Sequence, residues 1–271
     1  MRTSNSLEEG CSQVLTNPYH RIYRPYSSTS MPPNGGLLYY AEDQRYCDER
    51  MQLIRVYKML QSQVIETFEY IEPVHDNKDV YSLRYHQLYG NICAEIETNF
   101  RGILKTNRYE RGRERDWDVE RDFFKTNSAL RLNEYEIESY FFEIANISDV
   151  TQPFVNWNTS SYAPLSWYRE HNAVKHNRTL DFRNASLANT ITALAGLYVL
   201  LYAQFGFLVD SISNNGVMTV FFEGNDHLPV GIKNEMGYRF RHTPAWNISD
   251  MYMFDWDTIK MDTNPYIIFP F

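Results

Sequence analysis

Residues 184–209 read NASLANTITALAGLYVLLYAQFGFLV and contain no charged side chain. The length of this run suits a membrane span. However, Asn189, Thr192 and Gln204 dilute it with polar groups, and two glycines interrupt it. A helix that is hydrophobic on all sides is typical of a protein core. We therefore expect a fully buried helix here, with a single membrane anchor as the alternative.

Two more helices are expected upstream of this run. Between Glu42 and Glu72, apolar residues recur at spacings of three and four, and Pro73 ends the pattern. A second helix is predicted from about Val80 to Leu104, and its Glu97 and Arg101 form an i, i+4 pair in the favourable order. The fold class that follows is mainly α, an up-and-down helical bundle.

The remaining segments surround this helical body. Residues 1–40 are rich in Ser, Pro, Asn and Tyr, and predict a loosely ordered arm or one draped over the body. We assign residues 41–210 to the helical domain. Residues 211–271 are a C-terminal extension packed on the same domain, with short β or irregular pieces such as VMTVFFE at 217–223 and an apolar ending, NPYIIFPF.

Composition narrows the functional class. A net charge of −8 excludes a nucleic-acid binder that relies on overall positive charge, so any such contact needs a local basic patch. Three widely separated cysteines argue against a disulfide framework and against a cysteine zinc site. The first residues, MRTSNSLEEGCSQ, contain no apolar run, so we expect no signal peptide and a cytoplasmic location without membrane attachment.

The segment Trp167–Arg178, WYREHNAVKHNR, carries the densest group of chemically active side chains and precedes the apolar run. On a helix, Arg169, Asn172 and His176 share one face. The Cα atoms of Arg169 and His176 would lie about 10.5 Å apart, from a rise of ~1.5 Å per residue. Their side chains could converge on one small anion such as a phosphate.

Several chemistries do not fit this segment. His171 and His176 are five residues apart, which is wrong for a helical zinc pair, so we expect no metal and no cofactor. There is no G-x-S-x-G elbow, Walker A loop or G-x-G-x-x-G loop. A histidine with cations and an amide suits acid–base work at a phosphodiester. The alternative is that the histidine and asparagine are ordinary buried hydrogen-bonding groups.

Residues 105–125, KTNRYERGRERDWDVERDFFK, form a second charged segment whose first half is basic. One interpretation is a solvated connector. The other is a patch that holds RNA phosphates and stacks bases on Tyr109 and Trp117.

WYREHNAVKHNR followed by a long apolar helix resembles the HEPN superfamily, the helical domains of many prokaryotic toxin and defence proteins. The resemblance covers roughly Val80 to Val209, and the helix with Glu97 and Arg101 is similar to the helix that precedes the motif in that family. The family motif is an Arg, commonly followed by Asn, and then a His. Here His171 stands directly before Asn172, and Arg169 lies two helical turns before His176.

The resemblance implies a metal-independent endoribonuclease, in a toxin or antiviral (phage) defence setting, that pairs two motifs across a homodimer and binds RNA. In such an enzyme His176, Arg169 and Asn172 would be catalytic. Lys175, Arg178, His171 and Glu97 would bind substrate, and a protein partner from a defence operon is a further expectation. The alternative is a non-catalytic HEPN-like interaction or sensor protein that binds a protein partner or a nucleotide.

Overall fold

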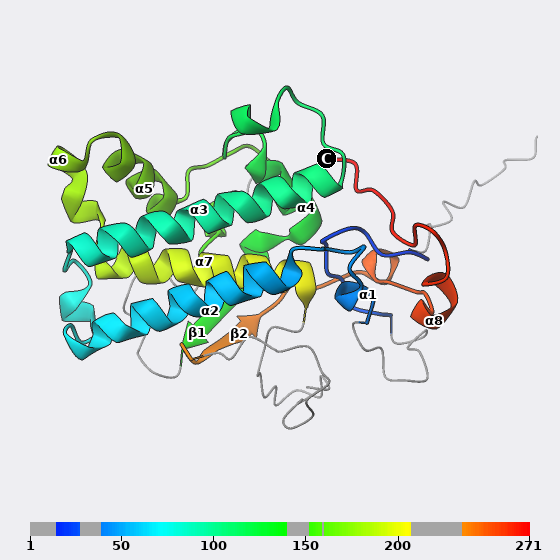
Figure 1. Ribbon diagram of the computed structural model, residues 1–271, viewed down its shortest axis with the longest axis horizontal. Coiled ribbons are helices and arrows are strands. Elements are labelled where there is room, and N and C mark those ends of the chain that lie inside the picture. The colour runs from blue at the N-terminus through cyan, green and yellow to red at the C-terminus, as the bar shows by residue number, and fades with distance from the viewer. Residues whose placement is uncertain (1–14, 28–38, 140–151, 159, 207–234) are drawn as a thin grey trace, which may run out of the picture.

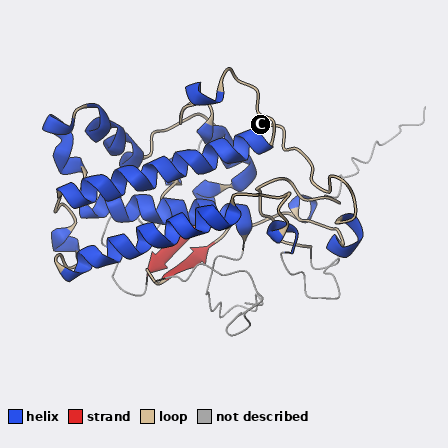
Figure 2. Ribbon diagram, in the orientation of Figure 1, coloured by secondary structure: helices blue, strands red, loops and turns tan. Residues whose placement is uncertain are grey.

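The computed structural model describes residues 15–27, 39–139, 152–158, 160–206 and 235–271. Its regular structure is mainly helical, as predicted, with one small sheet (Figure 2). The helices are α1 (Tyr39–Glu42), α2 (Arg50–Glu66), α3 (Leu83–Thr106), α4 (Asn127–Leu130), α5 (Ser166–His176), α6 (Arg178–Asp181), α7 (Leu187–Phe205) and α8 (Trp256–Ile259). The strands are β1 (Glu136–Ser139) and β2 (Tyr238–His242).

Three long helices, α2, α3 and α7, lie side by side and hold most of the core (Figure 1). Local signals fix their ends. Ser82 and Ser186 cap the starts of α3 and α7 by accepting hydrogen bonds from backbone N–H groups one turn on. Gly206 ends α7 with a φ of 72°, a left-handed conformation that glycine adopts without strain.

The first long helix begins later than the sequence pattern predicts. Residues 39–42 form a separate short turn, and α2 starts only at Arg50. Between them the Asp43 carboxylate accepts a hydrogen bond from the backbone nitrogen of Arg45 at 2.8 Å, and the Arg45 guanidinium also binds it. Such local bonds compete with helical ones, so the expected helix from Glu42 to Glu72 is too long at its start. It is also too long at its end, since α2 stops at Glu66 and a 3-10 turn follows at Thr67–Glu69.

The charge-free run forms α7, which packs against α3 and α2. It is long and apolar enough to cross a membrane, but 83% of its most apolar window is buried within the protein. Its polar residues have partners in the interior: the Gln204 side chain binds Asn99 at 2.9 Å and the carbonyl of Leu200 at 3.0 Å. The prediction of a buried core helix is confirmed.

The two ends of the described chain cover one end of these helices. The backbone nitrogen of Tyr23 donates to the carbonyl of Ala203 at 2.9 Å, and isolated bridges pair Tyr19 with Ile267 and Tyr26 with Tyr252. Residues 15–27 are therefore draped over the body. The expected strand at 217–223 lies outside the described residues.

The sheet is a single antiparallel pair. Ile137 of β1 faces Phe240 of β2, and an irregularity follows Glu136. Because Ile137 is fully buried, the pair closes the core beside α7.

Candidate functional site on helix α5

Helix α5 is fixed to the core through one side. Trp167 is almost completely buried, and its indole nitrogen donates to the carbonyl of Pro153 at 2.7 Å. A Cβ placed on Gly196 of α7 would meet the Trp167 ring at 3.3 Å, so a side chain there would crowd the indole. Val174, two residues before the end of α5, continues the buried side. The helix is thereby a rigid support for whatever its outer side carries.

Glu97 belongs to α3 and lies where that helix packs against α5. The hydroxyl of Tyr168 donates to its Oε1 at 2.8 Å, and Arg101 binds its Oε2 at 3.4 Å. Arg101 also donates to the carbonyl of Trp117 at 3.2 Å. The structure thus brings Glu97 to α5 through the buried Tyr168. This geometry makes Glu97 a residue that positions α5.

His171 occupies the same interface. Only 8% of its surface is exposed, and its ring centroid lies 5.4 Å from that of Tyr89 and 5.9 Å from that of Tyr168. Burial, with a smaller contribution from the positive charge of Lys175, lowers the pKa of His171 to about 4. Its imidazole is therefore neutral at pH 7 and packs inside the protein, whereas a phosphate ligand would need a charged and accessible ring.

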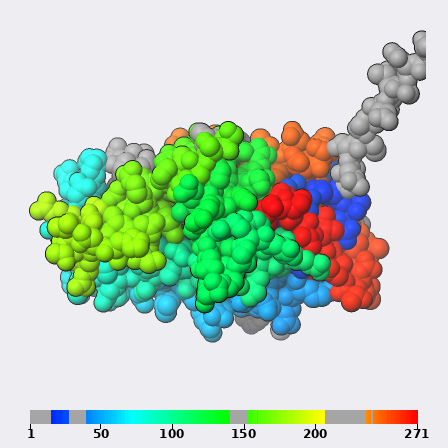
Figure 3. All heavy atoms as spheres, turned by 90° about the horizontal axis from the view of Figure 1, so that it is seen from above, coloured from blue at the N-terminus to red at the C-terminus, as the bar shows by residue number. Residues whose placement is uncertain are grey.

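The predicted catalytic residues occupy the opposite, solvent-facing side. Arg169 and His176 are exposed and Asn172 is half-buried. Their spacing of three and four places them along one face of the regular helix. Lys175 and Arg178 are exposed beside His176, and within the described part of the chain neither pairs with a carboxylate. Figure 3 shows α5 and α6 at the surface, in yellow-green at one end of the face.

Arg169 is already paired. Its guanidinium binds Oε1 of the neighbouring Glu170 at 2.9 Å, with 65% of the arginine side chain exposed. Glu170 also accepts a hydrogen bond from the amide of Asn184, which ties α5 to the turn before α7. Such an exposed pair is worth little energetically, so a phosphate can compete for the arginine.

A groove of about 490 Å³ runs between α5 and the segment Asp118–Arg121. Tyr168, Arg169 and Asn172 form the wall on α5. The rest of the lining is formed by Asp118, Val119, Glu120, Arg121, Tyr162 and Pro164. The groove joins the two charged segments that stood apart in the sequence, and Figure 3 shows them as neighbouring green and yellow-green surfaces.

The basic half of residues 105–125 is largely neutralised by carboxylates. Lys105 binds Glu114 at 3.5 Å, Arg113 binds Asp116 at 3.2 Å, and Arg111 binds the buried Asp122. Trp117 is buried, and its indole nitrogen donates to the carbonyl of Arg111. The segment is therefore a folded connector with paired charges, and these residues are not arranged as a phosphate clamp.

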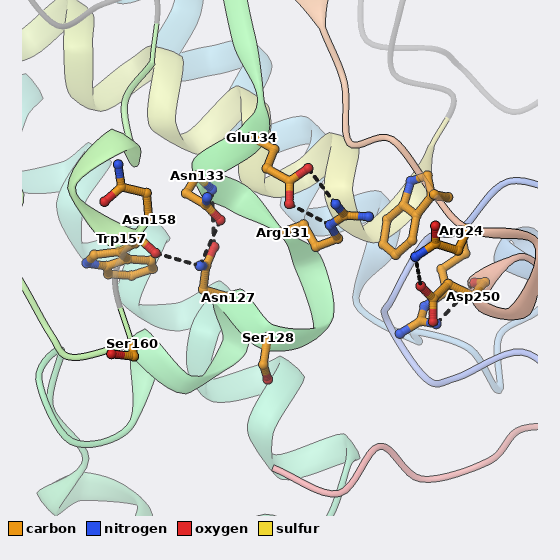
Figure 4. A pocket seen from close by; sticks show the side chains of 12 residues that line it. Arg24, Asn127, Ser128, Arg131, Asn133, Glu134, Trp157, Asn158, Ser160 and Asp250 are labelled. Carbon is orange, nitrogen blue, oxygen red and sulfur yellow. Dashed lines mark hydrogen bonds and ion pairs between the residues drawn. The ribbon is translucent and has the colours of Figure 1, made fainter.

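A second hollow of about 510 Å³ lies where distant segments meet (Figure 4). The guanidinium carbons of Arg24 and Arg131 lie 5.1 and 5.0 Å from the centre of the Trp246 ring. Arg131 also makes two hydrogen bonds to Glu134, at 2.6 and 2.7 Å, and Arg24 bonds to the carbonyl of Asp250 at 3.0 Å. Sequence reasoning did not find this cluster, because its members are far apart in the chain and share no motif. Both arginines contact the C-terminal segment, through Trp246 and, for Arg24, through Asp250, so the cluster joins the arm to that segment.

Among the described residues, no three His, Cys, Asp or Glu side chains come together as metal ligands. A scan against protein-family models finds no match, and searches of curated proteins and of solved structures find none either. The site must therefore be judged on its own chemistry.

Proposed function

We propose that this protein is a HEPN-like, metal-independent endoribonuclease of the cytoplasm, acting in a toxin or phage-defence setting, with its helices arranged as an up-and-down bundle. The observation that carries the proposal is the outer end of α5. There His176 is exposed, as are its close chain neighbours Lys175 and Arg178, at the end of a helix that Trp167 holds in the core.

The roles follow from the chemistry of RNA. The 2′-hydroxyl is an internal nucleophile, so cleavage needs a group that moves protons and groups that neutralise charge. His176 moves the proton, because an imidazole can both take and give one near neutral pH. Arg169 leaves Glu170 to bind the phosphate, and Asn172 orients it. Lys175 and Arg178 hold flanking phosphates.

We also propose that the active unit is a homodimer. Arg169 and His176 are two turns apart on one helix, and each α5 carries one such histidine. A twofold axis would bring a second set of the same groups to one cleft. Arg169 from one copy could then serve a phosphate that His176 of the other copy acts on.

One observation favours a second function, a non-catalytic HEPN-like protein that binds a partner or a nucleotide. Arg169 is paired with Glu170 in the isolated chain, and the groove beside it contains Asp118 and Glu120. If that pair persists with RNA present, the arginine cannot neutralise a developing charge. The residues would then form a recognition surface only.

Cleavage of RNA in EDTA separates the two functions. We expect the wild-type protein to cleave, and His176→Ala to be slower by about 10²–10⁴, the usual contribution of an acid–base group. His242→Ala is the matched control, because His242 is also exposed but lies on β2. Absence of cleavage by the wild type, or equal rates for the wild type and His176→Ala, would reject the nuclease proposal.

A further inference from the structure

The groove between α5 and Asp118–Arg121 has the composition of a base-binding site. Its volume of about 490 Å³ lies in the usual range for small-molecule sites, ~300–1,000 Å³. Both guanidinium groups along it are paired, Arg121 with Asp118 at 2.8 Å and Arg169 with Glu170 at 2.9 Å. Asp118 and Glu120 add negative charge. These carboxylates lie on the Asp118–Arg121 side, so an uncharged planar ring suits that side of the groove better than a phosphate, which belongs at Arg169 and His176 on α5.

Tyr162 supplies an aromatic surface to the lining of the groove. Its ring is half-buried and packs edge-on against Phe124, with centroids 5.8 Å apart. Its neighbourhood is acidic: burial first, and then the charges of Glu120 and Asp118, raise the pKa of Tyr162. Bases of single-stranded RNA stack on side chains of this kind.

Asn172 supplies a polar group that contacts a base edge in addition to the phosphate that it orients, because its amide has an acceptor for one and donors for the other. It lines the groove, and its amide makes no hydrogen bond to any of the residues that the structure describes. An asparagine amide both donates and accepts, as base edges require. His176 is one helical turn further along the same face, about 5–6 Å away between Cβ atoms. A base bound at Asn172 therefore places its own phosphate near His176.

We propose that this groove binds one unpaired nucleobase of single-stranded RNA, stacked on Tyr162 and hydrogen-bonded to Asn172, next to the phosphate at His176. The inference rests on the proposed function for the identity of the polymer. It adds a subsite, and it restricts the substrate to RNA whose bases are free. In a duplex the bases are stacked and paired, so none can enter the groove.

Binding can be measured without cleavage, which keeps the two proposals separable. The probe is a short fluorescent oligo(A) carrying 2′-O-methyl groups throughout, which lacks the internal nucleophile. Fluorescence anisotropy with this probe should show Tyr162→Ala binding about 5- to 150-fold more weakly than wild type, the usual contribution of one base–aromatic stack. Tyr162→Phe should bind like wild type, since the ring is retained. Tyr70→Ala, at an exposed tyrosine that ends the turn after α2, should also bind like wild type.

Further variants and a second probe test the same groove. Asn172→Ala should weaken the same probe, and a blunt duplex of the same chemistry should bind weakly and without dependence on Tyr162. If Tyr162→Ala does not fold, Tyr162→Leu replaces it, because leucine can still pack on Phe124 but offers no aromatic face. Equal affinity of wild type and the folded Tyr162 variant would overturn the inference. So would a probe that does not bind the wild type.

The outcomes also separate this inference from the nuclease. Cleavage that depends on His176 while binding ignores Tyr162 would leave the nuclease and remove the subsite. Binding that depends on Tyr162 without any cleavage by the wild type would leave the subsite and remove the nuclease.

Discussion

The side chain of Asp122 is a carboxylate with no exposed surface, so its charge must be balanced inside the protein. Burial alone would raise its pKa, but hydrogen bonds from Arg111, from the backbone nitrogen of Asp118 and from the Tyr109 hydroxyl together lower it. The charged form is thereby satisfied from three directions. One buried residue thus sets the position of the wall that faces α5 across the groove.

We expect Asp122→Ala to lower the melting temperature by several degrees, because it leaves donors without their acceptor. Asp116→Ala is the control, since it removes a carboxylate from an exposed pair with Arg113 and should change the melting temperature little. Thermal unfolding followed by circular dichroism makes the comparison. Equal effects of the two substitutions would show that the buried network does not fix the segment.

The lowered pKa of His171 should make the free energy of unfolding depend on pH. Its pKa is about 4 in the fold, against an ordinary value of 6.5, because burial disfavours the imidazolium ion. The unfolded chain therefore binds the proton more readily, and stability that is present above pH ~6.5 is lost as the pH falls through ~4. At pH 5 this loss is about 1–2 kcal/mol relative to pH 7.

Urea unfolding at pH 7 and pH 5 measures this contribution. His171→Gln should show a smaller loss between the two pH values than the wild type. His242→Gln, at an exposed position, should behave like the wild type. An unchanged pH dependence in His171→Gln would contradict the assignment.

The separate roles of the α5 residues are only partly visible in the sequence. The spacing of Arg169, Asn172 and His176 predicts one face, and they do lie along the solvent side of α5. The same spacing could not show that the side chain of His171, one residue before Asn172, points into the interior. That depends on where Tyr89 of α3 lies, which is tertiary information.

At the scale of the elements, the close approach of the N-terminal arm to α3 depends on a glycine. A Cβ on Gly102 would lie 1.9 Å from the Arg21 guanidinium. Arg21 is buried there, and donates to Oε1 of Gln204 at 2.9 and 2.8 Å. A side chain at position 102 would displace this arginine from its partner on α7.

Gly102→Ala should therefore destabilise the protein by about 1–2 kcal/mol, although alanine normally stabilises a helix by ~1 kcal/mol over glycine. Gly90→Ala is the control on the same helix, because a Cβ at position 90 meets nothing within 4 Å. It should stabilise by about 0.5–1 kcal/mol. Chemical denaturation gives both values, and stabilisation by Gly102→Ala would disprove the tight contact.

Periodicity predicts the existence of α2 and α3, and the charge-free run predicts α7, since each helix buries a long apolar stripe or surface. The residues at which these helices begin are harder to predict from the sequence. The Asp43 turn that delays α2 depends on one side chain and its local bonds. The first half of residues 105–125 is basic in sequence, but its pairing with Glu114, Asp116 and Asp122 depends on how the chain folds back on itself.

At the scale of the whole molecule, α5 and α6 lie on the surface of one end, while the arm and C-terminal segment cover the other (Figure 1). A second copy can therefore approach the α5 face without disturbing the arm. Light scattering at micromolar concentration should give the mass of a dimer. A monomer would remove the support for a site shared by two copies.

We propose that Arg169 and His176, drawn from two copies of α5, cleave RNA together. Mixing two variants, Arg169→Ala and His176→Ala, after joint unfolding and refolding tests it most directly. Each variant alone should be nearly inactive in EDTA, and the mixture should regain cleavage, because a mixed dimer contains one intact arginine and one intact histidine facing each other. A mixture no more active than its components, beside an active wild type, would contradict the shared site.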